Sequence, residues 1–439
     1  MRIVWLLILA LTALLGTFLY THFERDAPVI HTATHTMHIG GKYSHEFRLM
    51  DVGMGIETVR VWLQSGETQI ELLNRSYDGD LFRGAAINMP RAVDVSFDAR
   101  ELKLAPGPAT LHAEVVDFAW APNKTAVSVP LMIDTRAPRI SLQTGLTYVR
   151  RGGSEAVVYQ LNEEVEEHGV AVGDELFPGF KHPNDPTRFI AFYALSPDAS
   201  SVDMPAIVAS DRAGNRTRMP ISISVIEREF PSDEINLSDS FLDRKIAEIL
   251  GGEHPDRVAA YLQINDAMRA QNAATIREIC ANSSRERLWS GSFLQLPNSR
   301  VGAVFAEHRT YKYGGAVIDT QTHLGYDLAS TSRAEIPAAN DGVVIFADEL
   351  GIYGQAVIID HGLSLFSLYG HLSEISSEKG QAVARGEVIG TTGATGLAGG
   401  DHLHFAMLIN GTFVDPLEWF DGRWIREHID PKFADAPQP

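Results

Sequence analysis

The stretch HLHFAML, residues 402–408, places two histidines two positions apart at the start of an apolar run. An apolar run of this length is typical of a buried β-strand, in which alternate side chains point to the same face of the sheet. His402 and His404 are therefore expected to share one cleft, while Leu403 packs behind them. One of the two can bind a metal ion, and the other can stand beside a metal-bound water.

Two upstream segments supply residues of the same chemical kind. HLGYD, residues 323–327, sets a histidine and an aspartate four positions apart, and His371 lies in LYGHL, residues 368–372. A catalytic zinc needs three protein ligands and one open position, and two histidines with one carboxylate meet that count. Thiolate zinc sites and intramolecular disulfides are excluded, because Cys280 is the only cysteine. His361 is expected to lie at the end of a strand and not to be a ligand.

The order and spacing of these motifs resemble the M23 family of zinc metallopeptidases, of the lysostaphin and LytM type. The resemblance covers residues 296–419, a region rich in glycine and in short apolar strands. It extends into the segments between the motifs, which are NDGVV at 340–344, YGQAVIIDHG at 353–362, GQAV at 380–383, GEVIG at 386–390 and TGATG at 392–396. We therefore expect an antiparallel-β M23 domain over residues 295–425.

The resemblance also implies which residues carry the chemistry. His323, Asp327 and His404 would bind one Zn²⁺ ion. His371 and His402 would be catalytic: they would flank the fourth position of the metal, where a water sits, and act there as general base or acid. A neutral imidazole can take and return a proton near neutral pH, so no glutamate base is required.

Two segments depart from the family pattern. The Phe-Gly pair before the first ligand is Phe305-Ala306 here, followed by Arg309, and Gly-Thr-Pro-Val is replaced by Ala-Glu-Ile-Pro at residues 334–337. These departures concern the wall of the cleft and the fit of the substrate. The five ligand and proton-transfer positions are intact, whereas catalytically silent relatives that activate cell-wall amidases typically lose them.

The amino-terminal residues 3–20, IVWLLILALTALLGTFLY, carry no charge and are just long enough to cross a bilayer as a helix. Bulky residues follow where a signal peptidase would require small ones. We predict an uncleaved signal anchor over residues 1–22, which makes a single-pass protein of the cytoplasmic membrane with its bulk outside. A cleaved signal peptide is the alternative and gives the same compartment.

Two β-rich stretches follow, with apolar residues at every second position of the expected strands. These strands cover residues 57–63, 109–116, 125–133, 156–161, 189–195 and 220–225. DAPVI at 26–30 recurs as RAPRI at 136–140, and a proline before an extended run suits an opening edge strand. We predict two Ig-like β-sandwiches, over residues 26–135 and 136–228. Asp211-Arg-Ala-Gly-Asn215 is read as a plain turn, with a calcium loop as the alternative.

A helical linker is expected over residues 229–294, because the apolar period changes from two to about 3.6. Its helices should cover residues 240–250, 255–270 and 275–281, with Cys280 as a buried, small apolar residue. Residues 426–439 are expected to form a carboxy-terminal tail. The fold class is therefore multidomain and mainly β: a transmembrane helix, two sandwiches, a short helical linker and the M23 domain.

The net charge is −19, so the surface repels phosphate backbones and general nucleic-acid binding is excluded. The motifs favour a zinc endopeptidase that cuts peptide cross-links of peptidoglycan in the periplasm. The bond would be D-Ala to meso-diaminopimelate, or Gly–Gly in a monoderm host. The alternatives are a silent adaptor that activates an amidase and an envelope adhesion protein. The Ig-like modules would be spacers or bind envelope partners, and the loop 183–186 could reach and block the metal.

Overall fold

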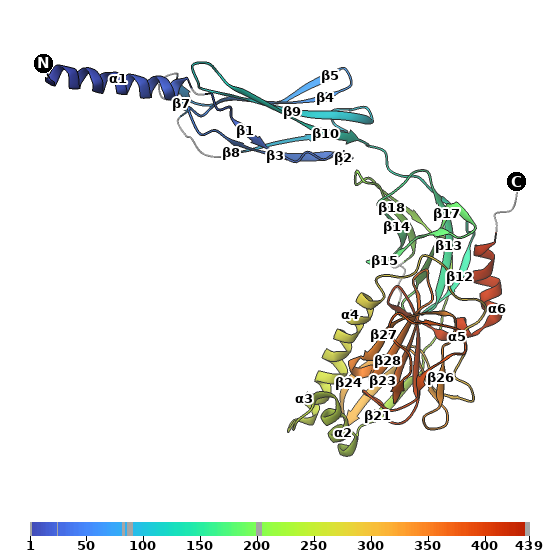
Figure 1. Ribbon diagram of the computed structural model, residues 1–439. Coiled ribbons are helices and arrows are strands. Elements are labelled where there is room, and N and C mark those ends of the chain that lie inside the picture. The colour runs from blue at the N-terminus through green and yellow to red at the C-terminus, as the bar shows by residue number, and fades with distance from the viewer. Residues whose placement is uncertain (1, 24, 81–83, 86–90, 199–203, 435–439) are drawn as a thin grey trace. The chain divides into compact units, whose positions relative to one another are not determined.

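The computed structural model describes residues 2–23, 25–80, 84–85, 91–198 and 204–434 (Figure 1). The chain is mainly β, as expected, and divides into two compact units. The first unit comprises Met1–Pro138 and Ser210–Arg216, and the second comprises Arg139–Ala209 and Thr217–Pro439.

The first unit begins with the apolar helix α1 (Arg2–His22), in which Ile3–Tyr20 is long and apolar enough to cross a membrane. Two largely antiparallel sheets follow and enclose one core that contains Phe47, Val61 and Leu111. One sheet has the order β1 (Val29–His31), β3 (Lys42–Met50), β8 (Arg91–Asp98). The other has the order β2 (Met37–Ile39), β10 (Lys124–Ile133), β9 (Gly107–Asp117), β4 (Ile56–Ser65), β5 (Thr68–Ser76), and β6 (Gly79–Asp80) pairs with β7 (Gly84–Ala85).

The second unit opens with another pair of sheets. One sheet has the order β11 (Ile140–Leu142), β13 (Ser154–Leu161), β17 (Asp185–Ala194), β16 (Phe180–His182). The other has the order β15 (Glu175–Pro178), β14 (Glu167–Val172), β18 (Ala206–Ser210), β19 (Arg216–Pro220). A short pair joins β12 (Thr147–Arg150) to β20 (Ile223–Ile226). The repeated proline segments precede β1 and β11, and both are edge strands, as predicted. The strand expected at 220–225 is split, because Pro220 ends β19 and has no N–H to continue the ladder.

The Asp211 turn has a counterpart in the first β-rich stretch. Asp211 accepts hydrogen bonds from the backbone and side-chain N–H groups of Asn215, at 2.9 and 2.8 Å. Asp117 accepts the same two bonds from Asn123, both at 2.8 Å. Each carboxylate is satisfied by its own loop, so the plain-turn interpretation explains both segments.

The helical region is more continuous than expected. Helix α2 (Asp239–Leu250) agrees with the prediction, but α3 (Arg257–Leu262), the π-helical turn η2 (Gln263–Met268) and α4 (Arg269–Ile279) form one uninterrupted helical run. No glycine or proline lies between residues 270 and 275 to break it. Cys280 follows α4 and is fully buried, as predicted. The strand β21 (Ser232–Asn236) pairs in parallel with a strand of the carboxy-terminal region, so the expected linker supplies part of a sheet there.

The carboxy-terminal region is built on a large antiparallel sheet. Its order is β22 (Arg300–Ala303), β25 (Tyr326–Ala329), β33 (Leu403–Ile409), β29 (Leu365–Leu372), β28 (Gln355–Asp360), β27 (Gly342–Glu349), β31 (Ala382–Val383), with β34 (Thr412–Val414) paired to β33. Two smaller sheets have the orders β21, β23 (Glu307–Tyr313), β24 (Ala316–His323) and β26 (Glu335–Pro337), β32 (Val388–Thr391), β30 (Glu374–Ile375).

Residues 426–433, expected to be a tail, are helical and packed. The chain continues through α5 (Pro416–Phe420), α6 (Gly422–Trp424), η4 (Ile425–Ile429) and η5 (Asp430–Phe433). Ile429 and Phe433 are buried in the hydrophobic core that the second pair of sheets shares with the carboxy-terminal region. Burial of these apolar side chains explains why this segment is ordered; residues 435–439 lie outside the described residues.

Candidate metal centre

Adjacent strands of the large sheet bring three of the predicted residues together. Asp327 on β25 is the direct cross-strand partner of His404 on β33. His404 is in turn opposite Gly370 on β29, so His371 follows one residue later on the neighbouring strand. His323 is the last residue of β24 and lies four positions before Asp327.

The potential ligand atoms of these residues converge on one point. His323 Nε2 lies 3.0 Å from Asp327 Oδ1 and 3.1 Å from His404 Nδ1. His404 Nδ1 lies 3.0 Å from the same carboxylate oxygen. All three side chains are at least four-fifths buried, so bulk water does not solvate these atoms freely.

The surrounding hydrogen bonds determine which ring nitrogens are free of protons. His323 donates its Nδ1–H to the carbonyl of Val304, at 3.0 Å, which leaves a lone pair on Nε2. His404 Nε2 is buried and has no hydrogen-bond partner, so either tautomer of this ring leaves one buried nitrogen unsatisfied. The Nδ1 atom of this ring, and not Nε2, faces the other two ligand atoms, so Nδ1 is the nitrogen that would bind a metal.

A single divalent cation would satisfy all three atoms. Ligand atoms at ~2.0–2.1 Å in a tetrahedral zinc site are roughly 3.3 Å apart, close to the observed 3.0–3.1 Å. Gly325 provides the room that the arrangement needs, because a Cβ there would lie 2.6 Å from His404 Nε2. Two imidazoles and one carboxylate are a donor set suited to Zn²⁺, so the residues fit this metal.

The two predicted catalytic histidines stand beside this cluster. The ring of His371 lies 4.9 Å from that of His402 and 5.8 Å from that of His404, between centroids. His371 donates its Nδ1–H to the carbonyl of Thr395 at 2.9 Å, and His402 donates its Nδ1–H to that of Gly400 at 2.8 Å. The Nε2 of His371 is therefore unprotonated, whereas the Nε2 of His402 faces Asp327 Oδ1 at 3.4 Å and bonds this carboxylate when it carries a proton.

The backbone of His371 is itself unusual. Its φ of 66° lies in the left-handed region, which a residue with a branched or bulky side chain rarely adopts. Such strain costs about 1–3 kcal/mol and is concentrated at functional sites. Here this backbone conformation turns the side chain of His371, near the end of β29, into the cleft.

Burial and neighbouring charges shift the pKa values in opposite directions. Burial raises the pKa of Asp327, but the adjacent imidazoles, first that of His323, outweigh it and hold this pKa well below its usual range. Burial lowers the pKa of His404 to about 4 and that of His371 well below its usual value. Burial also lowers the pKa of His402, but Asp327 outweighs it, so the net shift is upward. At pH 7 the carboxylate is ionised and His371 and His404 are neutral.

Arg309 holds the second oxygen of the carboxylate. Its Nη2 donates to Asp327 Oδ2 at 2.9 Å, while Oδ1 faces the two histidines. Its Nε donates to Glu307 at 3.0 Å, which fixes the guanidinium from the other side. From the sequence, Arg309 was expected only to be a departure from the family pattern. Glu307 and Arg309 lie two positions apart on one strand, so their side chains point to the same face. This spacing was the signal from which the Glu307–Arg309 pair could have been predicted.

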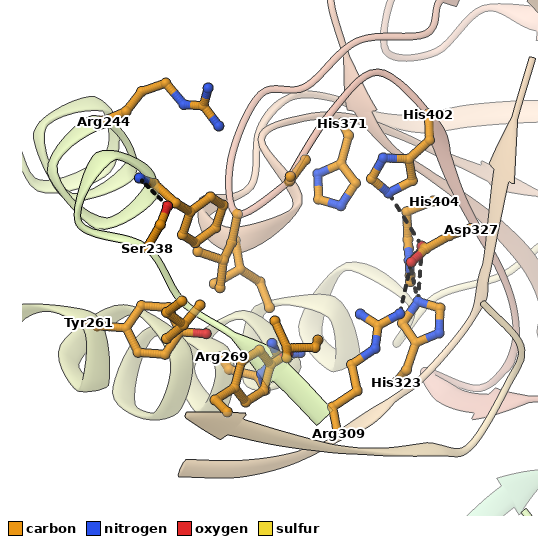
Figure 2. A pocket seen from close by; sticks show the side chains of 18 of the residues that line it. Ser238, Arg244, Tyr261, Arg269, Arg309, His323, Asp327, His371, His402 and His404 are labelled. Carbon is orange, nitrogen blue, oxygen red and sulfur yellow. Dashed lines mark hydrogen bonds and ion pairs between the residues drawn. The ribbon is translucent and has the colours of Figure 1, made fainter. Parts of the chain in front are cut away.

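The cluster lies on one side of a cleft of about 600 Å³ (Figure 2). The opposite side comes from the region expected to be a linker, which no pattern in the sequence indicated. Figure 2 shows Ser238, Arg244, Tyr261 and Arg269 on that side, with His371 and His402 across from them.

Two other expectations concern residues that lie away from the centre. His361 is buried outside the cluster, where its ring bonds the Asp341 carbonyl and the Ser367 hydroxyl, both at 2.7 Å. In the loop 183–186, Asn184 donates to the carbonyl of Phe433 at 2.7 Å. This loop does not line the cleft in the described part of the chain, so the suggestion that it blocks the metal is not supported.

These features define the carboxy-terminal region as a mainly β domain with a candidate metal centre of the metallopeptidase kind. Residues 321–416 match the model of Peptidase family M23, and this part of the chain is an M23 domain.

Two curated relatives and one solved structure illustrate the similarity. DD-carboxypeptidase/endopeptidase Mpg of Neisseria meningitidis is 43% identical over 95 residues, 22% of either chain. Peptidoglycan DD-endopeptidase ShyA of Vibrio cholerae is 36% identical over 96 residues, again 22% of either chain. A zinc-containing peptidase from Vibrio cholerae aligns over 71% of this chain and 81% of its own, with 15% identity and a TM-score of 0.28. The chain therefore spans about a fifth of the length of the curated relatives it matches.

Proposed function

We propose that this protein is a zinc-dependent endopeptidase that hydrolyses the peptide cross-links of bacterial peptidoglycan. The observation that carries the proposal is the convergence of His323, Asp327 and His404, with two further imidazoles that face the same point. All five lie in a cleft large enough for several residues of a peptide.

Each of these residues has a distinct role in the proposal. His323, Asp327 and His404 hold the metal, which when bound would polarise the scissile carbonyl and activate a water. His371 takes a proton on Nε2 and returns it to the leaving amine, because its Nδ1–H is committed to the Thr395 carbonyl. His402 faces Asp327 at 3.4 Å and donates to the oxygen that becomes negative in the tetrahedral intermediate.

The substrate and the compartment rest on the relatives and on α1. The relatives are named as DD-endopeptidases, and one name specifies peptidoglycan. A cross-link from D-Ala to meso-diaminopimelate is therefore the proposed bond, with Gly–Gly as the alternative. The apolar span Ile3–Tyr20 supports an anchor in the cytoplasmic membrane, with the domain on the periplasmic side.

A catalytically silent adaptor that activates a cell-wall amidase remains the second candidate. An adaptor needs the fold but not proton transfer, so nothing would maintain an unprotonated Nε2 on His371, and a His402 Nε2 that faces Asp327, beside the metal centre. The observed pair, with ring centroids 4.9 Å apart, favours the enzyme.

The test is digestion of purified, cross-linked peptidoglycan by the zinc-loaded, full-length protein in detergent. Mass spectrometry of the muropeptides should show dimers converted to monomers and identify the bond. His404→Ala is the matched control and should release nothing. Intact dimers with the wild-type protein, together with stimulation of an added amidase, would favour the adaptor.

A further inference from the structure

The helical region forms the second wall of the active-site cleft, and three polar contacts fix it there. Lys245 of α2 is 2% exposed and donates to the carbonyl of Ala394 at 2.6 Å. Asn272 of α4 accepts the N–H of Ile352 at 2.9 Å, and Asn265 donates to Asp319 at 2.7 Å. Helices that only link two domains do not require such contacts with the domain that carries the metal centre.

The Lys245 contact also sets the distance of α2 from the proton-transfer residue. Ala394 is next to Thr395, whose carbonyl holds the Nδ1–H of His371. The same short loop is thus bound by α2 on one side and by the catalytic imidazole on the other. Residues of α2 that face the cleft are therefore held at a fixed position relative to His371.

Two arginines of this wall face the cleft without an acidic partner. Arg244 is exposed, and its one aromatic contact is with Phe241, 5.9 Å from the guanidinium carbon to the ring centroid. Arg269 donates to the carbonyl and side-chain oxygens of Asn265, at 3.0 and 2.7 Å, which are neutral acceptors. In the part of the chain that the structure describes, no ion pair joins either arginine to a carboxylate. Both positive charges are therefore available to a ligand.

The charge of the cleft differs from that of the protein as a whole. The chain carries a net charge of −19 and repels anions at long range. Among the described residues that line the cleft, Asp327 is the only carboxylate, and Arg309 neutralises it at 2.9 Å. An anionic substrate would thus find local attraction only on the wall where Figure 2 shows Arg244 and Arg269.

We infer that Arg244 and Arg269, at two separate points of this wall, make it a carboxylate-binding subsite that selects acidic peptides for the metal centre. The planar fork of Arg244 can donate two parallel hydrogen bonds to a carboxylate, whereas Arg269 uses Nε and Nη2 on Asn265 and offers its remaining N–H groups. The inference rests on the proposed peptidase function and specifies the substrate class: a peptide with a free carboxylate beyond the scissile bond. The two arginines are specificity-determining residues and take no part in proton transfer.

The test compares two substrates with the full-length, zinc-loaded protein in detergent. One is a purified cross-linked muropeptide dimer, and the other is the same dimer with its carboxyl groups amidated. For the wild-type protein, amidation should raise KM about tenfold with little change in kcat, because a charge-assisted hydrogen bond contributes at least that factor. Rising NaCl should reduce this discrimination.

The variants assign the discrimination to the two arginines. Arg244→Gln combined with Arg269→Gln should raise KM for the free-acid dimer about tenfold and leave the amidated dimer unaffected. Arg285→Gln, an exposed arginine outside the cleft, is the matched control and should behave as wild type. If the two arginines had only a structural role, the double variant would raise KM for both dimers alike. That result, or equal cleavage of both dimers by the wild type, would overturn the inference.

A binding measurement separates this inference from the proposed function. Chelator-treated protein cannot turn over in the proposed mechanism, so equilibrium binding of each dimer can be measured directly. If zinc-loaded protein cuts neither dimer but metal-free protein prefers the free acid about tenfold, and the double variant does not, the subsite stands and the peptidase proposal falls. Equal affinity for the two dimers refutes the subsite, whatever the activity.

Discussion

The two carboxylate oxygens of Asp327 have different partners. Oδ1 faces His323 and His404, and Oδ2 accepts a hydrogen bond from Arg309. A carboxylate that is held at one oxygen presents the other in a fixed direction, and this preorganisation reduces the entropy lost when a metal binds.

Arg309→Gln should therefore weaken zinc binding without removing a ligand. We expect the zinc affinity to fall by about 10- to 100-fold, the usual effect of losing a partner that orients a metal ligand. Competition with a chromogenic chelator measures the affinity, with Arg285→Gln as the control. An unchanged zinc affinity in Arg309→Gln would show that Asp327 does not depend on this contact.

His361 makes stability depend on pH for a reason unrelated to the metal. It is fully buried, and burial lowers its pKa to about 4. An unfolded histidine has a pKa near 6.5, so between pH 6.5 and 4 the unfolded chain binds a proton that the folded chain does not. Stability is thus lost as the pH falls through this window, by about 3 kcal/mol for ~2.5 pKa units.

His361→Gln should remove this dependence while retaining an amide in place of the ring. The free energy of unfolding in urea, followed by tryptophan fluorescence, should fall less between pH 6.5 and 4 in the variant than in the wild type. The variant is expected to be less stable at pH 7, so the slope with pH is the informative quantity. Parallel pH profiles for the two proteins would contradict the assignment.

At the scale of residues, the sequence predicted which candidate site residues lie together better than which residues support them. Histidines and aspartates at ordered spacings are conspicuous, and the structure brings all five predicted site residues together. Arg309 supports Asp327 through a contact between residues 18 positions apart. Arg309 lies on β23 and Asp327 on β25, so the contact joins two different sheets, and no local pattern specifies it.

Helix α2 is joined to the loop beside His371 by one buried ammonium group, that of Lys245. Lys245→Met keeps the length of the side chain but leaves the carbonyl of Ala394 without its donor. An unsatisfied buried acceptor costs about 1–3 kcal/mol. Hydrogen exchange of residues 392–396 should become faster, and kcat should fall, because the loop that orients His371 becomes mobile.

Lys379→Met is the matched control for this variant, since Lys379 is exposed. It should change neither hydrogen exchange in residues 392–396 nor kcat. If Lys245→Met left both quantities at the wild-type values, α2 would have no role in the position of His371.

At the scale of elements, period and composition predicted most strands and α2. The predicted strands at 57–63, 109–116 and 125–133 lie within β4, β9 and β10. The strand β21 was missed because Ser232–Asn236 is largely polar and exposed. It forms only by parallel pairing with β23, a contact between segments that are distant in the sequence.

The second unit of the molecule is held together by a buried charged group. Glu155 on β13 is fully buried and forms an ion pair with Lys432 and a 3.0 Å contact with His428. These two partners lie in the helical turns that follow the M23 domain. The second pair of sheets and the M23 domain should therefore unfold together.

Glu155→Ala would leave the Lys432 ammonium buried without its partner. We expect a loss of about 3–5 kcal/mol in the free energy of unfolding, the usual cost of breaking a buried ion pair. Urea unfolding should show one transition for both parts, by tryptophan fluorescence and by hydrogen exchange of β13 and β17. Glu427→Ala removes an exposed pair with Arg423 and should cost less than about 1 kcal/mol.

Separate transitions in hydrogen exchange, one for β13 and β17 and another for β29 and β33, would contradict this coupling. At this scale the sequence was least informative. Composition predicted the mainly β class, but the segments expected to be a linker and a tail are integral parts of one core. Which elements share a core depends on packing between distant segments, and single-sequence periodicity does not encode that packing.

The most direct test of the central claim is the metal dependence of turnover. Release of muropeptide monomers from cross-linked peptidoglycan would be measured for the full-length protein as purified, after chelation, and after stepwise return of Zn²⁺. We predict that chelation abolishes release and that one equivalent of zinc per chain restores it. Release that persists without metal, or no release with one zinc bound per chain, would contradict the account.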